Sequence, residues 1–451
     1  LFADFSGPPP GGPLAAWAPA DPAGCAAYPP LRAAAPAVAV VRRGSCTFEQ
    51  KALRAQSGGA AGLVVVNDAE DVSPMGRNAS NTSSGVDIFV VGIARSFGDA
   101  LAGDVGRAPA ASLLLSFAVY EPALLDASEA VILLLATSMV ACGAWFSTAD
   151  LRRGSPLAPR HDEEVVEVSH SAAMAFCVFG SLMLCVLFFL MEYLIWVVLF
   201  GFCVGGGQCL AQFGAMILTY SCPRLQAHAL TLPFFGRASR AELISAAAAA
   251  AVVVAWFCSR DSAYSWPLQD IIGVGFLCMI QRTIRLPNMQ VATVLLSVMF
   301  FFDIFWVFLS PYVFGQSVMV QVATGGRTHE TVPMLFRIPK INDPFHSDNM
   351  LGFGDIAVPG LLASLLRRRD ILAGKRGFAG YFAPCVAGYA VGLCATLVAL
   401  SLSRMGQPAL LYLVPGTLGT TWALALRRGE AAQLWSGGAP VPCGGAAGGA
   451  A

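Results

Sequence analysis

This 451-residue chain contains few charged residues. Asp, Glu, Lys and Arg make up 12% of its residues, whereas soluble domains usually carry about 25%. Hydrophobic residues make up 56%, and apolar runs near the length of a membrane-spanning helix recur along the chain. The 28 basic and 28 acidic residues cancel, which argues against nucleic acid as a main partner. The composition therefore predicts a polytopic α-helical membrane protein whose solvent is the lipid bilayer.

Patterns typical of metal and nucleotide sites are also missing. Most of the 13 cysteines lie in apolar runs without CxxC or Cys/His spacing, so we interpret them as small buried hydrophobic residues. The triplet Gly205-Gly206-Gly207 is not followed by the Lys-Ser/Thr of a phosphate-binding loop, and close helix packing explains it better. We therefore expect no cofactor and no metal.

The N-terminal part looks soluble and divides in two. Residues 1–36 are rich in Pro, Ala and Gly and predict little structure. From 37 to 127, short apolar strands alternate with helical segments, as in a small α/β domain. Because the chain begins with Leu1, we expect a signal peptide to have been removed or truncated.

Two features of this part suit the lumenal or extracellular side of a membrane. Cys25 and Cys46 are its only cysteines, and they would form one disulfide if the domain faces an oxidising compartment. Asn78 and Asn81 each begin a glycosylation sequon in the same turn-rich loop. We accordingly expect the N-terminus outside the cytosol.

Residues 128–427 predict a membrane domain of about nine helices, followed by a disordered cytosolic tail at 428–451. Arg and Lys cluster in alternate connections, for example at 367–369 and 375–376, which favours an odd number of spans with a cytosolic C-terminus. The long connection after the sixth segment would then be exoplasmic, and its residues 317–322 and 331–336 are interpreted as a β-hairpin. The expected spans lie near 128–147, 171–191, 193–219, 241–258, 267–281, 289–314, 351–366, 378–402 and 407–426.

Two carboxylates stand out within these apolar segments. Asp303 is the only charged residue between Gln290 and Ser310, and Asp355 lies between glycines at the mouth of the next span. A carboxylate in hydrocarbon costs several kcal/mol unless it is paired or neutral, so both are candidate functional residues. Two such groups that share a proton could activate water as in an aspartic protease. Gln269 and Asp270, in contrast, are interpreted as packing or connection residues.

Further residues around the pair suit a peptide substrate. Gly352 and Gly354 would allow unusual backbone dihedrals and the close approach of another backbone. Pro408 and Pro415 flank an apolar stretch and would leave backbone groups free at membrane depth, which is tolerated only where the chain lines a cavity or packs on protein.

Three motifs together resemble the GxGD intramembrane aspartyl proteases, the class that includes presenilin and signal peptide peptidase. The strings FDIFWVF, LGFGDIAVPGLL and QPALLYLVP look most like the signal-peptide-peptidase-like proteins of the type 2 subfamily. That subfamily also carries an N-terminal protease-associated domain, which the run VAVVRRGSCTFEQKALRAQSGGAAGLVVVND resembles. The resemblance implies a nine-helix fold, a catalytic pair at Asp303 and Asp355, and an active-site or substrate-binding role for Phe302, Gly352, Phe353, Gly354, Pro408, Ala409 and Leu410.

The resemblance also implies partners and a location. The expected substrates are type II single-span membrane proteins, the protein is expected to form a homodimer, and it would reside in the secretory or endosomal system, in the endosome or lysosome, Golgi, plasma membrane or endoplasmic reticulum. One departure is Phe302, where the family usually has tyrosine. This departure keeps open a weakly active family member that acts as a binding or quality-control factor. A separate alternative is a proton-coupled transporter in which the same carboxylates relay protons.

Overall fold

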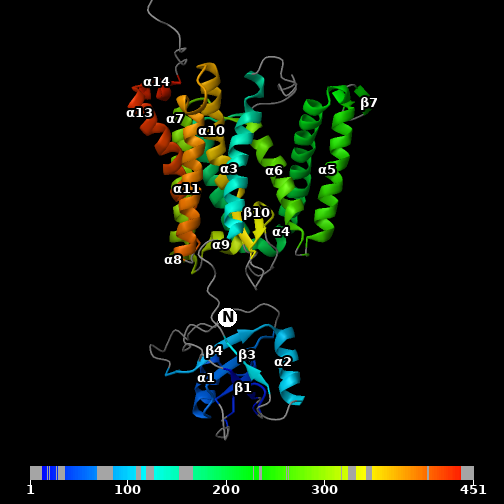
Figure 1. Ribbon diagram of the computed structural model, residues 1–451, viewed down its shortest axis with the longest axis vertical. Coiled ribbons are helices and arrows are strands. Elements are labelled where there is room, and N and C mark those ends of the chain that lie inside the picture. Colours follow the sequence, from blue (N-terminus) through cyan, green and yellow to red (C-terminus); the bar gives the residue numbers. More distant parts are fainter. Residues whose placement is uncertain are drawn as a thin grey trace, which may run out of the picture. The chain divides into compact units, whose positions relative to one another are not determined.

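The computed structural model divides the chain into two compact units, Leu1–Pro122 and Ala123–Ala451, and each has its own hydrophobic core (Figure 1). The boundary lies close to the one expected near residue 127. The residues that the structure describes are 13–17, 19, 21–26, 28, 36–68, 85–107, 113–117, 126–151, 166–226, 228–232, 236–260, 262, 264–315, 317–323, 332–341, 348–403 and 406–437.

The first unit contains a five-stranded sheet in the order β4-β3-β2-β1-β5, with β1 to β4 parallel and β5 antiparallel to β1. One strand corrects the prediction, because β1 lies within residues 1–36, where little structure was expected. Four residues are too few to show a strand pattern, and pairing with β2 orders them. The strands are β1 Leu14–Trp17, β2 Ala37–Arg42, β3 Gly62–Val66, β4 Phe89–Ile93 and β5 Leu114–Leu115.

Helices α1 (Phe48–Ser57) and α2 (Arg95–Arg107) complete this unit. Helix α1 begins where the Thr47 side chain accepts a hydrogen bond from the backbone N–H of Gln50, and the Gln50 side chain reciprocates. Alternate residues of β2 enter two different cores, so both faces of the sheet are covered. A disulfide joins Cys25 and Cys46 beside this sheet.

The second unit is a bundle of helices with three short strand pairs. Six of its described helices are long and apolar enough to cross a membrane: Ala127–Ser147, His170–Met191, Tyr193–Ser221, Arg240–Ser259, Met289–Phe314 and Phe382–Ser403. The elements before the candidate site are α3 Ala127–Ser147, η1 Ala149–Leu151, β6 Val166–Glu167, α4 His170–Ser221, η2 Pro223–Gln226, β7 His228–Leu232, β8 Gly236–Ser239, α5 Arg240–Ser259, α6 Trp266–Thr283 and β9 Ile284–Arg285.

The remaining elements carry the sequence motifs. They are α7 Met289–Ile304, η3 Phe305–Leu309, α8 Ser310–Phe314, α9 Val318–Ala323, β10 Leu335–Pro339, β11 Asp348–Gly352, α10 Phe353–Leu372, η4 Gly377–Ala379, α11 Phe382–Ser403, α12 Leu410–Val414, η5 Pro415–Gly419, α13 Thr420–Arg428 and α14 Ala431–Ser436. Figure 1 shows α8, α9 and β10 at one end of this bundle and β7, α13 and α14 at the other. The connections thus alternate between two ends, as a membrane-spanning chain requires.

Three expected spans form helices without meeting the same criterion of length and hydropathy. Helix α6 carries buried polar residues, α10 ends in three arginines, and the last segment is divided among α12, η5 and α13. The count of nine spans therefore stays a prediction, whereas a polytopic helical membrane fold is established.

The predicted hairpin in the long connection is wrong in its first strand. Residues Val318–Ala323 form helix α9, and the hairpin that exists pairs β10 with β11. The apolar, β-branched run at 318–322 suggested a strand, but burial of Val318 and Val322 against the bundle selects one helical face instead. The second predicted strand overlaps β10 only at Leu335 and Phe336.

Candidate active site

Asp303 lies one residue before the end of α7, and its side chain is only 2% exposed. Its Oδ2 accepts a hydrogen bond of 2.9 Å from the backbone N–H of Leu410. Leu410 is the first residue of α12, and N–H groups in the first turn of a helix have no acceptor within that helix. The QPAL segment therefore supplies a donor that offsets part of the cost of burying this carboxylate.

A widened turn follows Asp303 directly. Residues Phe305–Leu309 form a π-helical turn, η3, between α7 and α8, and such turns occur frequently at functional sites. The same feature recurs in the last span, where Pro415 begins the π-helical turn η5. Pro415 cannot donate a backbone hydrogen bond, so it favours an irregular turn at this position. Both segments that meet at Asp303 thus depart from regular helix nearby.

Asp355 occupies the first turn of α10, immediately after β11. A Cβ at Gly352 would lie 3.2 Å from the Asp355 Oδ2, whereas a Cβ at Gly354 would meet no atom within 4 Å. Gly352 has φ −65° and ψ 139°, an ordinary extended conformation, so the predicted need for unusual dihedrals is wrong here. The glycines instead leave room, Gly352 for the carboxylate and Gly354 for a molecule approaching the helix.

Phe353 fixes the start of α10. Its side chain is 5% exposed and packs against Phe336 of β10, with ring centroids 4.9 Å apart. A Cβ at Gly273 of α6 would come within 2.4 Å of the Phe353 ring, so this ring fits closely against a glycine on α6. Phe353 therefore anchors the strand-to-helix junction that presents Asp355.

Helices α7, α10 and α12 are in mutual contact and bring the three sequence motifs together. Asp355 lies within electrostatic reach of Asp303, although the two residues are 52 positions apart in sequence. Pro408 and Ala409 are both buried and lead into Leu410 beside Asp303. The structure thus assembles the carboxylates and the QPAL segment into one site.

Phe302 adjoins Asp303 in sequence, but its ring extends towards α4. The ring carbons Cε2 and Cζ lie 3.6 and 3.7 Å from the position of a Cβ at Gly180, and the ring of Trp306 is also near. A tyrosine hydroxyl in this rotamer would therefore extend towards α4.

Tyr389 of α11 is a residue that the sequence did not single out. It is completely buried, it lies within electrostatic reach of Asp355, and its hydroxyl has no hydrogen-bond partner among the described residues. The preceding glycine lets α11 pack closely on η5, since a Cβ at Gly388 would lie 2.1 Å from the carbonyl oxygen of Gly416. One tyrosine in an apolar run gives no signal, so only the three-dimensional arrangement identifies it.

The hairpin beside Asp355 is fixed to α6 by two polar residues that were interpreted as packing or connection residues. Gln269 donates from Nε2 to the carbonyl of Leu335 at 2.8 Å, and Asp270 accepts from the N–H of Arg337 at 3.1 Å. These side chains bond to the carbonyl of Leu335 and the N–H of Arg337, which a further strand would need in order to pair with β10. The outer edge of β10 is therefore covered, and β11 provides the other edge of the hairpin.

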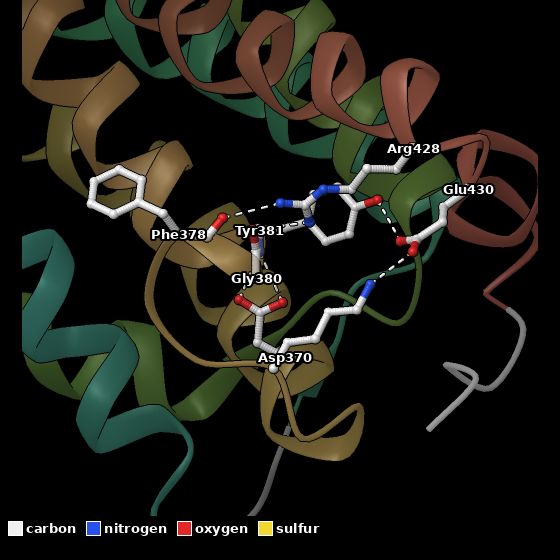
Figure 2. Close-up of polar contacts among 7 residues, drawn as sticks. Asp370, Phe378, Gly380, Tyr381, Arg428 and Glu430 are labelled. Atoms are coloured by element: carbon white, nitrogen blue, oxygen red, sulfur yellow. Dashed lines mark hydrogen bonds and ion pairs between the residues drawn. The ribbon is translucent and has the colours of Figure 1, made fainter. Parts of the chain in front are cut away.

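A polar cluster joins the far end of α10 to the last helices (Figure 2). The buried Asp370 carboxylate accepts hydrogen bonds of 2.8–2.9 Å from the N–H groups of Tyr381 and Phe382, at the start of α11. The Tyr381 hydroxyl donates to Glu430 at 2.6 Å, and the Lys375 ammonium donates to the other Glu430 oxygen at 2.7 Å. These contacts connect α10 and α11 to the junction of α13 and α14.

Arg428 extends the same cluster. Its guanidinium donates to the carbonyls of Phe378 at 3.0 Å and Gly380 at 3.2 Å, and it lies 4.9 Å from the centre of the Tyr381 ring (Figure 2). We call Asp370, Lys375, Tyr381, Arg428 and Glu430 the terminal latch. The latch holds α10, which bears Asp355, against the last span, which bears Leu410.

The two predicted glycosylation residues cannot be placed in this description. Asn78 and Asn81 lie outside the described residues, so their modification stays a prediction.

No group of three or more His, Cys, Asp or Glu side chains with a metal-binding arrangement occurs among the described residues.

Comparison with known proteins places most of the chain in one group. A sequence model described as signal peptide peptidase matches residues 160–440, and one described as PA domain matches residues 11–101. The chain is 37% identical to Signal peptide peptidase-like 3 of Oryza sativa subsp. japonica, over 93% of this chain and 80% of that protein. It is 38% identical to Signal peptide peptidase-like 3 of Arabidopsis thaliana, over 88% and 77%. It is 34% identical to Signal peptide peptidase-like 2B of Gallus gallus, over 89% and 69%.

Proposed function

This chain belongs to the signal peptide peptidase family, and on that premise we propose that it is an intramembrane aspartyl endopeptidase in which Asp303 and Asp355 activate water. The observation that carries the proposal is the single site formed by α7, α10 and α12, where the two carboxylates lie in electrostatic reach beside the QPAL segment. An integral membrane peptidase can act there on a bond that lies within the bilayer.

In the proposed mechanism, Asp303 is the general base. The N–H of Leu410 compensates negative charge on Asp303, so the proton that the pair shares rests on Asp355. Asp303 takes a proton from water as the water oxygen bonds to the substrate carbonyl carbon, and Asp355, which hydrogen-bonds the carbonyl oxygen, transfers its proton to that oxygen. The resulting gem-diol collapses, the C–N bond breaks, and the leaving nitrogen receives a proton from the pair.

The proposed substrates are type II single-span membrane proteins, with cleavage inside their transmembrane segment. A scissile amide in a helix is shielded by its i→i−4 hydrogen bonds, so the substrate must unwind locally before it reacts. The open space at Gly354, beside Asp355, suits the approach of such an unwound backbone. Three further proposals rest on the sequence alone. They are an N-terminus outside the cytosol, a homodimer, and a location within the secretory or endosomal system.

The test is cleavage of one labelled type II substrate by the full chain reconstituted in liposomes. We expect Asp303→Asn and Asp355→Asn each to abolish cleavage, by at least about 10³-fold, because neither remaining carboxyl can both activate water and polarise the carbonyl. Asp104→Asn, an exposed carboxylate on α2, is the matched control and should cleave normally. Continued cleavage by either active-site variant would refute the mechanism, and substrate binding without any cleavage by the unaltered chain would favour the binding-factor alternative.

We further propose that the unwound substrate pairs with the outer edge of β11. In the pairing register, Leu351 and Asn349 bond to β10, so the backbone groups of Met350 and Gly352 point away from it. This edge leads directly into α10 and Asp355, and a strand added here would lie beside the carboxylates. Residues Val318–Ala323, where the sequence predicted a strand, form a helix and offer no strand edge of their own.

Met350→Pro tests the pairing, because proline removes one outward N–H without removing a bond between β10 and β11. We expect the catalytic efficiency to fall about tenfold or more, mainly through KM, while Met350→Ala retains most activity. Equal cleavage by the proline and alanine variants would exclude β11 as the docking edge.

A further inference from the structure

A groove lies between the start of α7, the C-terminal part of α10 and helix α14. Its cavity volume is about 230 Å³, whereas roughly 10–15 Å³ on the same measure is enough to hold one water molecule. Its lining includes the buried side chains of Met289, Leu366 and Leu434, one from each of these helices. The groove therefore has an apolar floor built by three separate elements.

The rim of the groove is cationic. Arg368 and Arg369 both line it, directly after the apolar stretch that ends at Leu366. Arg368 pairs with Asp150 at 2.5 Å, whereas the guanidinium of the partly buried Arg369 makes no ion pair or hydrogen bond with any residue that the structure describes. One guanidinium is therefore available for an anion at the point where the wall changes from apolar to charged.

Aromatic residues mark the same level of the bundle. Trp435 of α14 follows Leu434, is 43% exposed, and its ring lies 5.7 Å from that of Trp422 on α13. Tryptophan concentrates at the membrane–water interface, and the Lys and Arg distribution assigns this end of the bundle to the cytosolic side. The apolar floor, the cationic rim and the tryptophan thus lie at one end of the bundle, which the Lys and Arg distribution predicts to be the cytosolic interface.

We propose that this groove binds an anionic glycerophospholipid of the cytosolic leaflet. An acyl chain lies on the exposed Leu372 and the half-buried Leu365, which continue the apolar floor, and the phosphate of the headgroup pairs with Arg369. Charge complementarity selects this occupant, because a free phosphate would leave these leucines uncovered and a neutral lipid would leave Arg369 unpaired. The proposal concerns binding only and does not depend on the proteolytic activity.

The experiment uses the full chain in detergent with equal amounts of phosphatidylcholine and phosphatidylserine, and native mass spectrometry counts the lipid retained. We expect preferential retention of phosphatidylserine and a fall of about tenfold with Arg369→Gln, the effect of losing one charge-assisted contact. Leu372→Asp, which adds negative charge at an exposed lining position, should weaken retention similarly. Arg376→Gln removes an equal charge from an exposed position outside the groove and should retain lipid normally.

The readout distinguishes lipid from phosphate and folding from binding. Glycerophosphoserine and inorganic phosphate, added as soluble competitors, should not displace the lipid because neither covers the apolar floor. Equal retention of the two lipids, unchanged retention by Arg369→Gln with an unaltered melting temperature, or displacement by either competitor would overturn the proposal. Lipid retention is compared only between proteins whose melting temperatures match that of the unaltered chain. If Arg369→Gln unfolds, Leu372→Asp replaces it as the weakened variant. Arg369→Lys keeps the charge and should bind the lipid.

Discussion

At the residue scale, the two carboxylates differ in what surrounds them. Asp303 is almost completely buried and accepts a hydrogen bond from the N–H of Leu410, whereas Asp355 is partly exposed, interacts with the backbone N–H of Gly352, and lies beside the open space at Gly354. This asymmetry is the physical basis for assigning them different roles. Two further positions decide which hydroxyl groups can contact the carboxylates: Phe302, which lacks a hydroxyl, and Tyr389, which has one.

A pair of single-hydroxyl exchanges tests these two residues. We expect Tyr389→Phe to lower kcat about tenfold with little change in KM, because it removes a buried hydroxyl near Asp355 that can orient a carboxylate or water. Phe302→Tyr should change the rate less than about threefold, since the added hydroxyl would extend towards Gly180 of α4. Cleavage kinetics on one labelled substrate measure both. A gain from Phe302→Tyr combined with no loss from Tyr389→Phe would contradict this assignment.

At the element scale, the site depends on helices that are held at both ends. Near Asp355, Gln269 and Asp270 of α6 fix the hairpin that precedes α10. At the other end, the terminal latch joins α10 to the last span through Glu430 and its partners. Contacts far from the carboxylates therefore constrain how α10 packs against α12. The same contacts constrain the position of Leu410 beside Asp303.

The latch predicts a pH-dependent stability. Hydrogen bonds from Lys375 and Tyr381 lower the pKa of Glu430, so its contribution is complete above the unfolded pKa of a glutamate and is lost as the pH falls through the folded pKa. Glu430→Gln should therefore destabilise the bundle at neutral pH by about 1 kcal/mol, as for other partly exposed pairs.

Thermal melts of the two proteins in detergent over a pH series measure this effect. The difference in Tm should be largest near neutral pH and should shrink on acidification. Glu167→Gln, which removes an exposed carboxylate on β6, should show no such difference. A difference for Glu430→Gln that stays constant across the acid range would show that its charge is not what stabilises the latch.

At the scale of the whole molecule, the two units have separate cores and unlike solvents. The sheet of the first unit buries both faces against its own helices and side chains, whereas the helices of the second expose apolar residues around the bundle. Stability in one unit should therefore respond little to substitutions in the other.

The disulfide tests this independence. Cys25 and Cys46 close a loop with a sequence separation of 21, so Cys25→Ser with Cys46→Ser should destabilise the first unit by about 3 kcal/mol. Calorimetry of the full chain should show one transition shifted to lower temperature and the other unchanged. A parallel shift of both transitions would mean that the units unfold together.

Much of this protein could be predicted from its sequence because hydrocarbon imposes strong constraints. Low charge and long apolar runs indicate a helical membrane protein, and a carboxylate inside such a run is costly enough that Asp303 and Asp355 stand out without any structure. The alternation of short apolar strands with helical segments from residue 37 likewise predicts the α/β unit, because strands that are buried on both faces of a sheet have continuous apolar sequences.

Tertiary structure alone decided the features that depend on distant partners. Strand β1 exists because β2 pairs with it, the run at 318–322 is helical because one face is buried, and Gln269 and Asp270 matter because β10 lies against them. Tyr389 and the terminal latch are invisible in sequence for the same reason. A local sequence pattern shows which side chains a segment must bury. Only the packing of the helices decides which neighbouring element covers them, and which backbone N–H donates a hydrogen bond to a buried aspartate.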